Sequence, residues 1–167
     1  MRISLIVLQG LARIKRIRQM ARVARDTEGR MDITGRRILI VDDHSLMRRM
    51  VAAELRKLGN PEIDEAADGE SALQKINEAS AGGKPYQMVF LDWTMPKLDG
   101  FSVLTACRAH AALKDMPIIM LTSESEEANL VKALEAGATA YIAKPFKPED
   151  ICKKVLDVME WNARRAG

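Results

Sequence analysis

The sequence predicts a three-layer α/β domain, with a doubly wound sheet of five parallel strands and helices on both faces. Four short apolar runs and one shorter strand segment, residues 62–66, alternate with five segments of helical periodicity. Runs of this kind, without polar residues at every second position, are typical of strands that are buried on both faces. A strict strand–helix alternation favours parallel strands joined by right-handed crossovers.

Each element has its own signal. The helices end or begin at turn residues: Gly59-Asn60-Pro61 ends the first, Gly137 closes the fourth with positive φ, and Pro148 opens the last. Ser45 is expected to cap the first helix. The predicted strands cover residues 37–41, 62–66, 88–91, 117–121 and 139–143, and the helices cover 46–58, 70–78, 101–110, 126–135 and 148–163.

The chain divides into an N-terminal extension, residues 1–35, and one domain, residues 36–163. The 167 residues contain 26 Lys and Arg and 23 Asp and Glu, for a net charge of +3. The first 30 residues hold eight of the basic and two of the acidic residues, so the remainder carries a charge of −3. An acidic body with no helix-turn-helix pattern is a poor candidate for direct DNA binding.

The extension has the pattern of an imperfect basic amphipathic helix. Apolar and basic side chains fall on different faces at 100° per residue. The uncharged run of residues 3–12 is too short to span a membrane, and no cleavage site of a secretory signal precedes the basic residues. Four interpretations stay open for residues 1–30: a weak membrane-surface anchor, a helix that docks on an acidic partner, a mobile tail, or a segment that precedes a true start at Met31. The apolar face has Ile14, Ile17, Met20, Ala21 and Ala24, and the basic face has Lys15, Arg18, Arg22 and Arg25.

Polar side chains stand where four of the five predicted strands end. Because the carboxyl ends of parallel strands meet at one edge of the sheet, we expect these side chains to lie together. Clustered carboxylates are ligands that Mg²⁺ prefers, and a lysine and a hydroxyl beside them supply donors for an oxyanion. Together they are the parts needed to transfer a phosphoryl group onto a carboxylate. The polar residues are Asp42 and Asp43, Asp92, Thr122 and Ser123, and Lys144, which Pro145 follows.

Four motifs make the chain resemble the receiver domain of two-component response regulators, and within that family the CheY-like, single-domain chemotaxis type. They are Ile-Leu-Ile-Val-Asp-Asp (38–43), Phe-Leu-Asp-Trp-Thr-Met-Pro-Lys-Leu-Asp-Gly (90–100), Leu-Thr-Ser (121–123) and Ala-Lys-Pro-Phe (143–146). The likeness covers the whole body of the chain. It implies a flavodoxin-like sheet with the strand order 2-1-3-4-5.

The resemblance also implies roles for the site residues. Asp92 would be the phosphoacceptor, and Mg²⁺ would be coordinated by Asp43, Asp92 and the backbone carbonyl of Thr94. Asp42 would act on the metal through water, and Lys144 would pair with a phosphoryl oxygen.

A second set of implied roles concerns the response to phosphorylation. Thr122 would move to hydrogen-bond the phosphoryl group, and Tyr141 would follow it inward. Pro145 is expected in the cis form. The output face would extend from Glu126 to Ala163.

Thr94 departs from the pattern of the chemotaxis relatives, which have Asn at this position. In this family the side chains at Thr94 and Glu124 flank the route of the hydrolytic water, so the phosphoryl lifetime of Asp92 is left open. Thr94 also argues against a haloacid-dehalogenase-type phosphatase, which needs an Asp there. An FMN-binding flavodoxin is disfavoured because Asp-Asp-His, residues 42–44, replaces its phosphate loop.

The expected function is therefore a stand-alone phospho-switch, with no enzymatic activity except assistance to its own phosphotransfer and autodephosphorylation. The expected partners are a sensor histidine kinase or phosphotransfer protein and an output protein, with the flagellar motor switch as the favoured target. The alternative is a phosphorelay intermediate or phosphate-sink receiver. Two isolated cysteines, Cys107 and Cys152, suggest a reducing cytoplasm.

Overall fold

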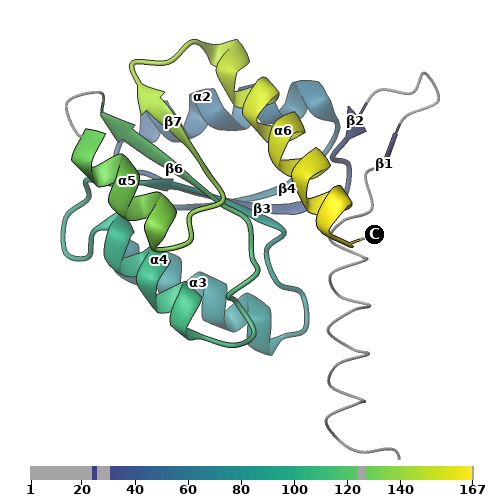
Figure 1. Cartoon of the computed structure of the whole chain (residues 1–167). Coiled ribbons are helices and arrows are strands. Elements are labelled where there is room, and N and C mark those ends of the chain that lie inside the picture. Colours follow the sequence, from purple (N-terminus) through teal and green to yellow (C-terminus); the bar gives the residue numbers. More distant parts are fainter. Residues whose placement is uncertain (1–23, 26–30, 124–126, 167) are drawn as a thin grey trace, which may run out of the picture.

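Five parallel strands form the central sheet in the order β4-β3-β5-β6-β7 (Figure 1). The structure, a computed structural model, describes residues 24–25, 31–123 and 127–166. Numbered along the body of the chain, the strand order is 2-1-3-4-5, which confirms the prediction. The strands are β3 (Arg37–Val41), β4 (Glu62–Ala66), β5 (Met88–Asp92), β6 (Ile118–Ser123) and β7 (Ala140–Lys144).

Helices cover both faces of this sheet, as expected for a three-layer domain. Helices α2 and α6 pack together on one face, while α3, α4 and α5 lie on the other (Figure 1). The helices are α2 (Ser45–Leu55), continued by the short 3-10 helix η1 (Arg56–Leu58), then α3 (Gly69–Ala81), α4 (Gly100–Ala109), α5 (Glu127–Glu135) and α6 (Pro148–Ala166).

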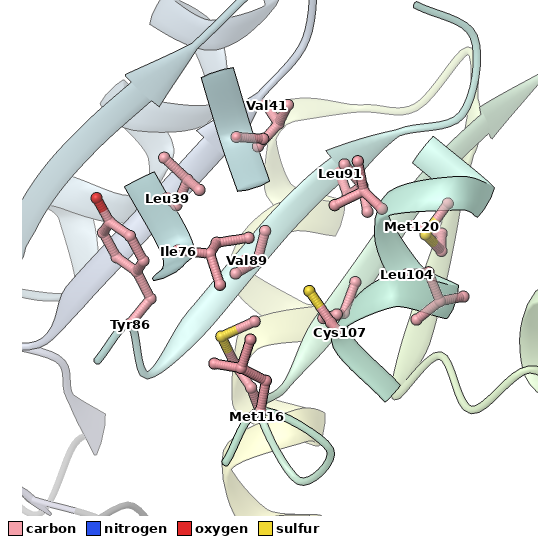
Figure 2. Close-up of a cluster of buried hydrophobic side chains, with 14 of the residues drawn as sticks. Leu39, Val41, Ile76, Tyr86, Val89, Leu91, Leu104, Cys107, Met116 and Met120 are labelled. Atoms are coloured by element: carbon pink, nitrogen blue, oxygen red, sulfur yellow. The ribbon is translucent and has the colours of Figure 1, made fainter. Parts of the chain in front are cut away.

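Side chains of the three central strands alternate between two hydrophobic clusters, one on each face. In β5, Val89 and Leu91 enter the cluster on the α3 and α4 side, shown in Figure 2, and Met88 and Phe90 enter the cluster under α2 and α6. All four are at most 4% exposed. Burial on both faces explains why the strands read as continuous apolar runs. It also fixes the register, since a shift by one residue would exchange the two faces.

Most predicted boundaries agree with the structure to within three residues, and the differences matter at the strand ends. Asp92 and Lys144 are the last residues of β5 and β7, and Thr122 and Ser123 belong to β6, whereas the sequence placed all four just after the strands. The predicted cap at Ser45 is wrong: His44 occupies the N-cap position and makes no side-chain capping bond. Gly137 does adopt positive φ.

Residues before position 36, the predicted start of the domain, also pack into the core. Ile33 is wholly buried in the cluster under α2 and α6, and its backbone N–H donates to the carbonyl of Leu58 at 3.0 Å. Two residues of the predicted amphipathic helix, Ala24 and Arg25, form strand β1, which pairs antiparallel with β2 (Met31–Asp32). The rest of that predicted helix lies outside the described residues. In the described parts of the chain no helix is both long and apolar enough to cross a membrane.

Candidate functional site

The polar side chains at the carboxyl edge of the sheet do come together. Asp42 follows β3 directly, and Asp92, Thr122 and Lys144 end or nearly end β5, β6 and β7. Three of these four residues are buried: Asp42 is 0% exposed, Thr122 4% and Asp92 5%. Buried carboxylates need charged or hydrogen-bonding partners, so their grouping calls for a cation.

Lys144 supplies that cation and joins the two buried carboxylates. Its Nζ lies 3.0 Å from Oδ2 of Asp42 and 2.9 Å from Oδ1 of Asp92. Burial works against the charge of Lys144, but the hydrogen bonds to Asp92 and Asp42 outweigh it and raise its pKa. The lysine is therefore held as an ammonium ion between the carboxylates.

The surroundings of Asp92 disfavour the ionised form of its carboxyl group. Burial raises the pKa of its carboxyl group, and the nearby charges of Asp42 and Asp43 raise it further, while Lys144 acts in the opposite direction. An additional positive charge near Asp92 would therefore stabilise its ionised form.

The loop between β3 and α2 places a second carboxylate, that of Asp43, next to Asp42, and His44 contacts both. Oδ1 of Asp42 accepts the backbone N–H of His44 at 2.8 Å. Nδ1 of His44 lies 2.9 Å from Oδ1 of Asp43 and 3.3 Å from Oδ1 of Asp42. Arg48 fixes the loop from α2, since its Nη1 donates to the carbonyl of Asp42 at 2.7 Å.

This loop provides donor atoms that fit a divalent cation. Ligand atoms of Asp42, Asp43 and His44 all lie within 4.8 Å of one another. Oxygen-rich donor sets of this kind suit Mg²⁺, which keeps part of its hydration shell. Asp92 lies outside this group, and its Oδ1 is 2.9 Å from Nζ of Lys144. The metal contacts that the resemblance implied for Asp92 and for the Thr94 carbonyl stay predictions.

The first residue of α4, Gly100, packs directly against the backbone of Asp92 and Trp93 at the end of β5. The N–H of Gly100 donates to the carbonyl of Trp93 at 2.9 Å. A Cβ at Gly100 would lie only 2.1 Å from the carbonyl oxygen of Asp92, so no larger residue fits. Lys97, with φ of 67°, reaches back to Asp68 at the N-terminus of α3, with Nζ 2.9 Å from Oδ2.

The two residues expected to respond to phosphorylation lie on neighbouring strands. Thr122 of β6 pairs with Ala143 of β7, two residues beyond Tyr141. The Tyr141 ring is half-buried, and Nζ of Lys154 from α6 lies 5.7 Å from its centroid. Beside it is a hollow of about 350 Å³ between β7 and α6, which Phe146, Lys153 and Lys154 also line. The Lys144–Pro145 bond is cis, as the resemblance implied.

Three polar contacts of the site were not expected from the sequence. They are the ring of His44, the guanidinium of Arg48 and the bridge from Lys97 to Asp68. The Asp-Asp-His run could have indicated the first, since it places an imidazole next to two carboxylates. Arg48 and Lys97 carried no comparable signal. Glu124, predicted to influence dephosphorylation, lies outside the described residues, as does Glu126 at the start of the predicted output face.

Comparison with known proteins agrees with this arrangement. The family model of the response regulator receiver domain matches residues 38–156. A chemotaxis protein CheY homolog of Campylobacter jejuni is 36% identical over 123 residues, which cover 74% of this chain and 92% of the relative.

Solved structures give the same picture. A putative response regulator from Chloroflexus aurantiacus matches with a TM-score of 0.68 and 32% identity, over 75% of this chain and 98% of the other. The chemotaxis response regulator CheY4 of Vibrio cholerae matches with a TM-score of 0.66 and 34% identity, over 75% and 99%. With its strand order, its cluster of Asp42, Asp92 and Lys144, and these relatives, the chain belongs to the response regulator receiver domain family.

Proposed function

We propose that this protein is a phospho-switch that receives a phosphoryl group on Asp92 from the phosphohistidine of a sensor kinase or phosphotransfer protein. The observation that carries the proposal is the position of Lys144, whose Nζ contacts both Asp42 and Asp92 at the carboxyl edge of the sheet. This arrangement places a buried carboxylate next to a cation at the edge of the sheet.

The transfer follows from the chemistry of these groups. An oxygen of Asp92 attacks the phosphorus, the P–N bond of the phosphohistidine breaks, and the imidazole nitrogen keeps the electron pair. The Lys144 ammonium pairs with a phosphoryl oxygen as negative charge builds up there. A Mg²⁺ ion bound near Asp42 and Asp43 would offset further phosphoryl charge when present. The Thr122 hydroxyl, at the end of the adjacent strand, donates to the product.

Signal loss would follow the reverse logic, with water attacking the phosphoryl group of Asp92. The exposed side chain of Thr94 stands two residues from the acceptor, and so it influences access of that water. In this proposal the protein assists only its own phosphorylation and dephosphorylation and turns over no external substrate.

Output would come from protein binding on the face formed by β7 and α6. The new dianionic group favours one of two conformers, in which Thr122 and Tyr141 have moved towards it. Tyr141 borders the hollow that Lys153, Lys154 and two acidic residues of α6 also line, so its displacement would reshape a charged surface. Chemotaxis, with the flagellar motor switch as target, is the favoured version, since CheY-type proteins are among the relatives.

Phosphorylation can be tested with acetyl phosphate and Mg²⁺, followed by intact mass. The wild-type chain should gain one acid-stable, base-labile phosphoryl group, and Asp92→Asn should gain none. Asp157→Asn, which alters an exposed acid of α6, is the matched control and should react like the wild type. Persistence of the modification in Asp92→Asn would refute the assignment of the acceptor.

The output is tested separately with beryllofluoride, which mimics the phosphoryl group on aspartate. A chemotaxis regulator should bind a motor-switch peptide more tightly in the beryllofluoride-loaded form than in the free form. Equal affinity, combined with phosphoryl transfer from Asp92 back to a phosphotransfer histidine, would instead identify a relay or phosphate-sink receiver. Many turnovers of an external phosphomonoester would contradict the switch function altogether.

A further inference from the structure

The side chain of His44 faces the acidic group of the β3–α2 loop. Its Nδ1 lies 2.9 Å from Oδ1 of Asp43 and 3.3 Å from Oδ1 of Asp42. Two ligands at right angles around an ion with bonds of about 2.1 Å are separated by roughly 3 Å. The nitrogen and one oxygen of each carboxylate lie within 4.8 Å of one another, so all three could reach one ion.

The backbone fixes this position without help from the ring. His44 donates its N–H to Asp42 and is the N-cap of α2. Its carbonyl accepts the N–H of Arg48 at 3.2 Å, and the Arg48 side chain holds the carbonyl of Asp42. Because the loop is anchored at both ends, the imidazole reaches the two carboxylates by side-chain rotation alone.

We propose that His44 Nδ1 is a direct ligand of the metal site, which thereby takes first-row transition dications such as Zn²⁺ in preference to Mg²⁺. An imidazole nitrogen suits these ions, whereas Mg²⁺ prefers oxygen donors. The side chain of His44 is 75% exposed, so the site is open to ions and to water on that side. The inference rests on the metal site of the proposed function and adds to it the class of ion.

The occupant has consequences for the switch. Asp42 would use Oδ1 towards the ion, since Oδ2 is held by Lys144. His44 and Asp43, both exposed, would hold the ion together with Asp42. The identity of the ion would then affect how strongly the site favours phosphorylation.

The test is a pair of metal titrations, with Zn²⁺ alone and with Mg²⁺ alone, on wild type, His44→Ala and His110→Ala. His110 is the other histidine of the chain and follows α4, where its Nδ1 lies 3.3 Å from the N–H of Ala112. Loss of a ligand should weaken Zn²⁺ binding of His44→Ala by about 10-fold or more. Mg²⁺ binding should change by less than about 3-fold, and His110→Ala should match the wild type.

A direct readout comes from ¹⁵N-labelled histidine. Zn²⁺ should shift the Nδ1 resonance of His44 and leave that of His110 in place. Asp43→Asn should abolish both the shift and the tight Zn²⁺ binding.

Three outcomes would overturn the inference: unchanged Zn²⁺ affinity in His44→Ala, equal weakening of both ions, or Zn²⁺ binding that survives in Asp43→Asn. Because no phosphodonor is used, these results are independent of whether acetyl phosphate modifies Asp92, which tests the proposed function.

Discussion

Nζ of Lys144 lies 2.9 Å from Oδ1 of Asp92, although β6 separates the two strands that carry them. The residues are 52 positions apart in the chain. The contact forms only when β5, β6 and β7 are all in place, so completion of the sheet and assembly of the site are the same event. Lys144 also holds Asp42 beyond β3, and its removal should therefore affect the stability of the whole carboxyl edge.

Lys144→Met should lower the free energy of unfolding of the metal-free protein at pH 7 by about 2 kcal/mol, because two buried carboxylates lose a charged hydrogen-bond partner. The deficit should shrink at lower pH as the Asp92 carboxylate becomes protonated, because burial raises its pKa. Urea unfolding in EDTA measures both effects. Lys147→Met, at an exposed lysine, is the control. A deficit that does not change with pH would mean that lost packing, and not lost charge, is responsible.

Asp92→Asn should instead stabilise the metal-free protein at neutral pH. Burial and the charges of Asp42 and Asp43 raise the pKa of Asp92 in the folded state, so folding disfavours its ionised form. This cost develops as the pH rises from the ordinary pKa of about 3.9 through the raised pKa, and it persists at pH 7. The gain in the variant should therefore vanish at low pH.

Urea unfolding across that range checks this prediction, with Asp157→Asn as the control for the loss of one exposed acidic charge. If Asp92→Asn were less stable than the wild type at pH 7, the bond to Lys144 would outweigh the cost of burying the Asp92 charge.

The sheet and most of its site could be predicted from the sequence because both follow from periodicity. A strand buried on both faces is a continuous apolar run, and the polar residue that ends it marks the edge where Asp92, Thr122 and Lys144 meet. Family motifs then supplied the strand order and the cis bond before Pro145.

The loops could not be predicted in this way, because their contacts depend on three-dimensional approach and not on a repeat. Nothing in the sequence indicates that Lys97 would adopt positive φ and reach Asp68, 29 residues away. Nor does it show that Ile33, in a polar stretch, fills the core under α2 and α6.

Two effects of Lys97 on stability can be separated: its ion pair with Asp68 and the positive φ of its backbone. Lys97→Ala and Lys97→Gly both lose the bridge, but glycine adopts positive φ freely, so Lys97→Gly should be the more stable by about 1 kcal/mol. Urea unfolding of the two variants measures this difference. Equal stability would show that the loop relaxes to another conformation once the bridge is gone.

The same bridge predicts a pH effect. The hydrogen bond from the Ser71 N–H and the contact with Lys97 lower the pKa of Asp68 to about 2. Its contribution to stability is present above the ordinary pKa of about 3.9 and is lost as the pH falls towards about 2. In Lys97→Ala the pKa should rise while staying below the ordinary value, because the Ser71 bond remains. An NMR titration of the Asp68 carboxyl carbon decides this, and an unchanged pKa would mean that Lys97 adds nothing.

Gly100→Ala should damage both the fold and the site. A Cβ there would lie 2.1 Å from the Asp92 carbonyl oxygen and 3.2 Å from the Cα of Trp93, so the backbone at the acceptor must move. We expect a loss of about 2 kcal/mol in the free energy of unfolding. Mg²⁺ binding should also become weaker. The fluorescence of Trp93 in a Trp161→Phe background measures this binding.

Gly83→Ala is the matched control, because that glycine has φ of 74° and open space around its missing Cβ. It should cost about 1 kcal/mol from backbone conformation alone and leave Mg²⁺ binding unchanged. If Gly100→Ala lost stability but bound Mg²⁺ as the wild type does, the backbone of Asp92 would have kept its place while α4 moved. That result would separate the start of α4 from the geometry of the acceptor.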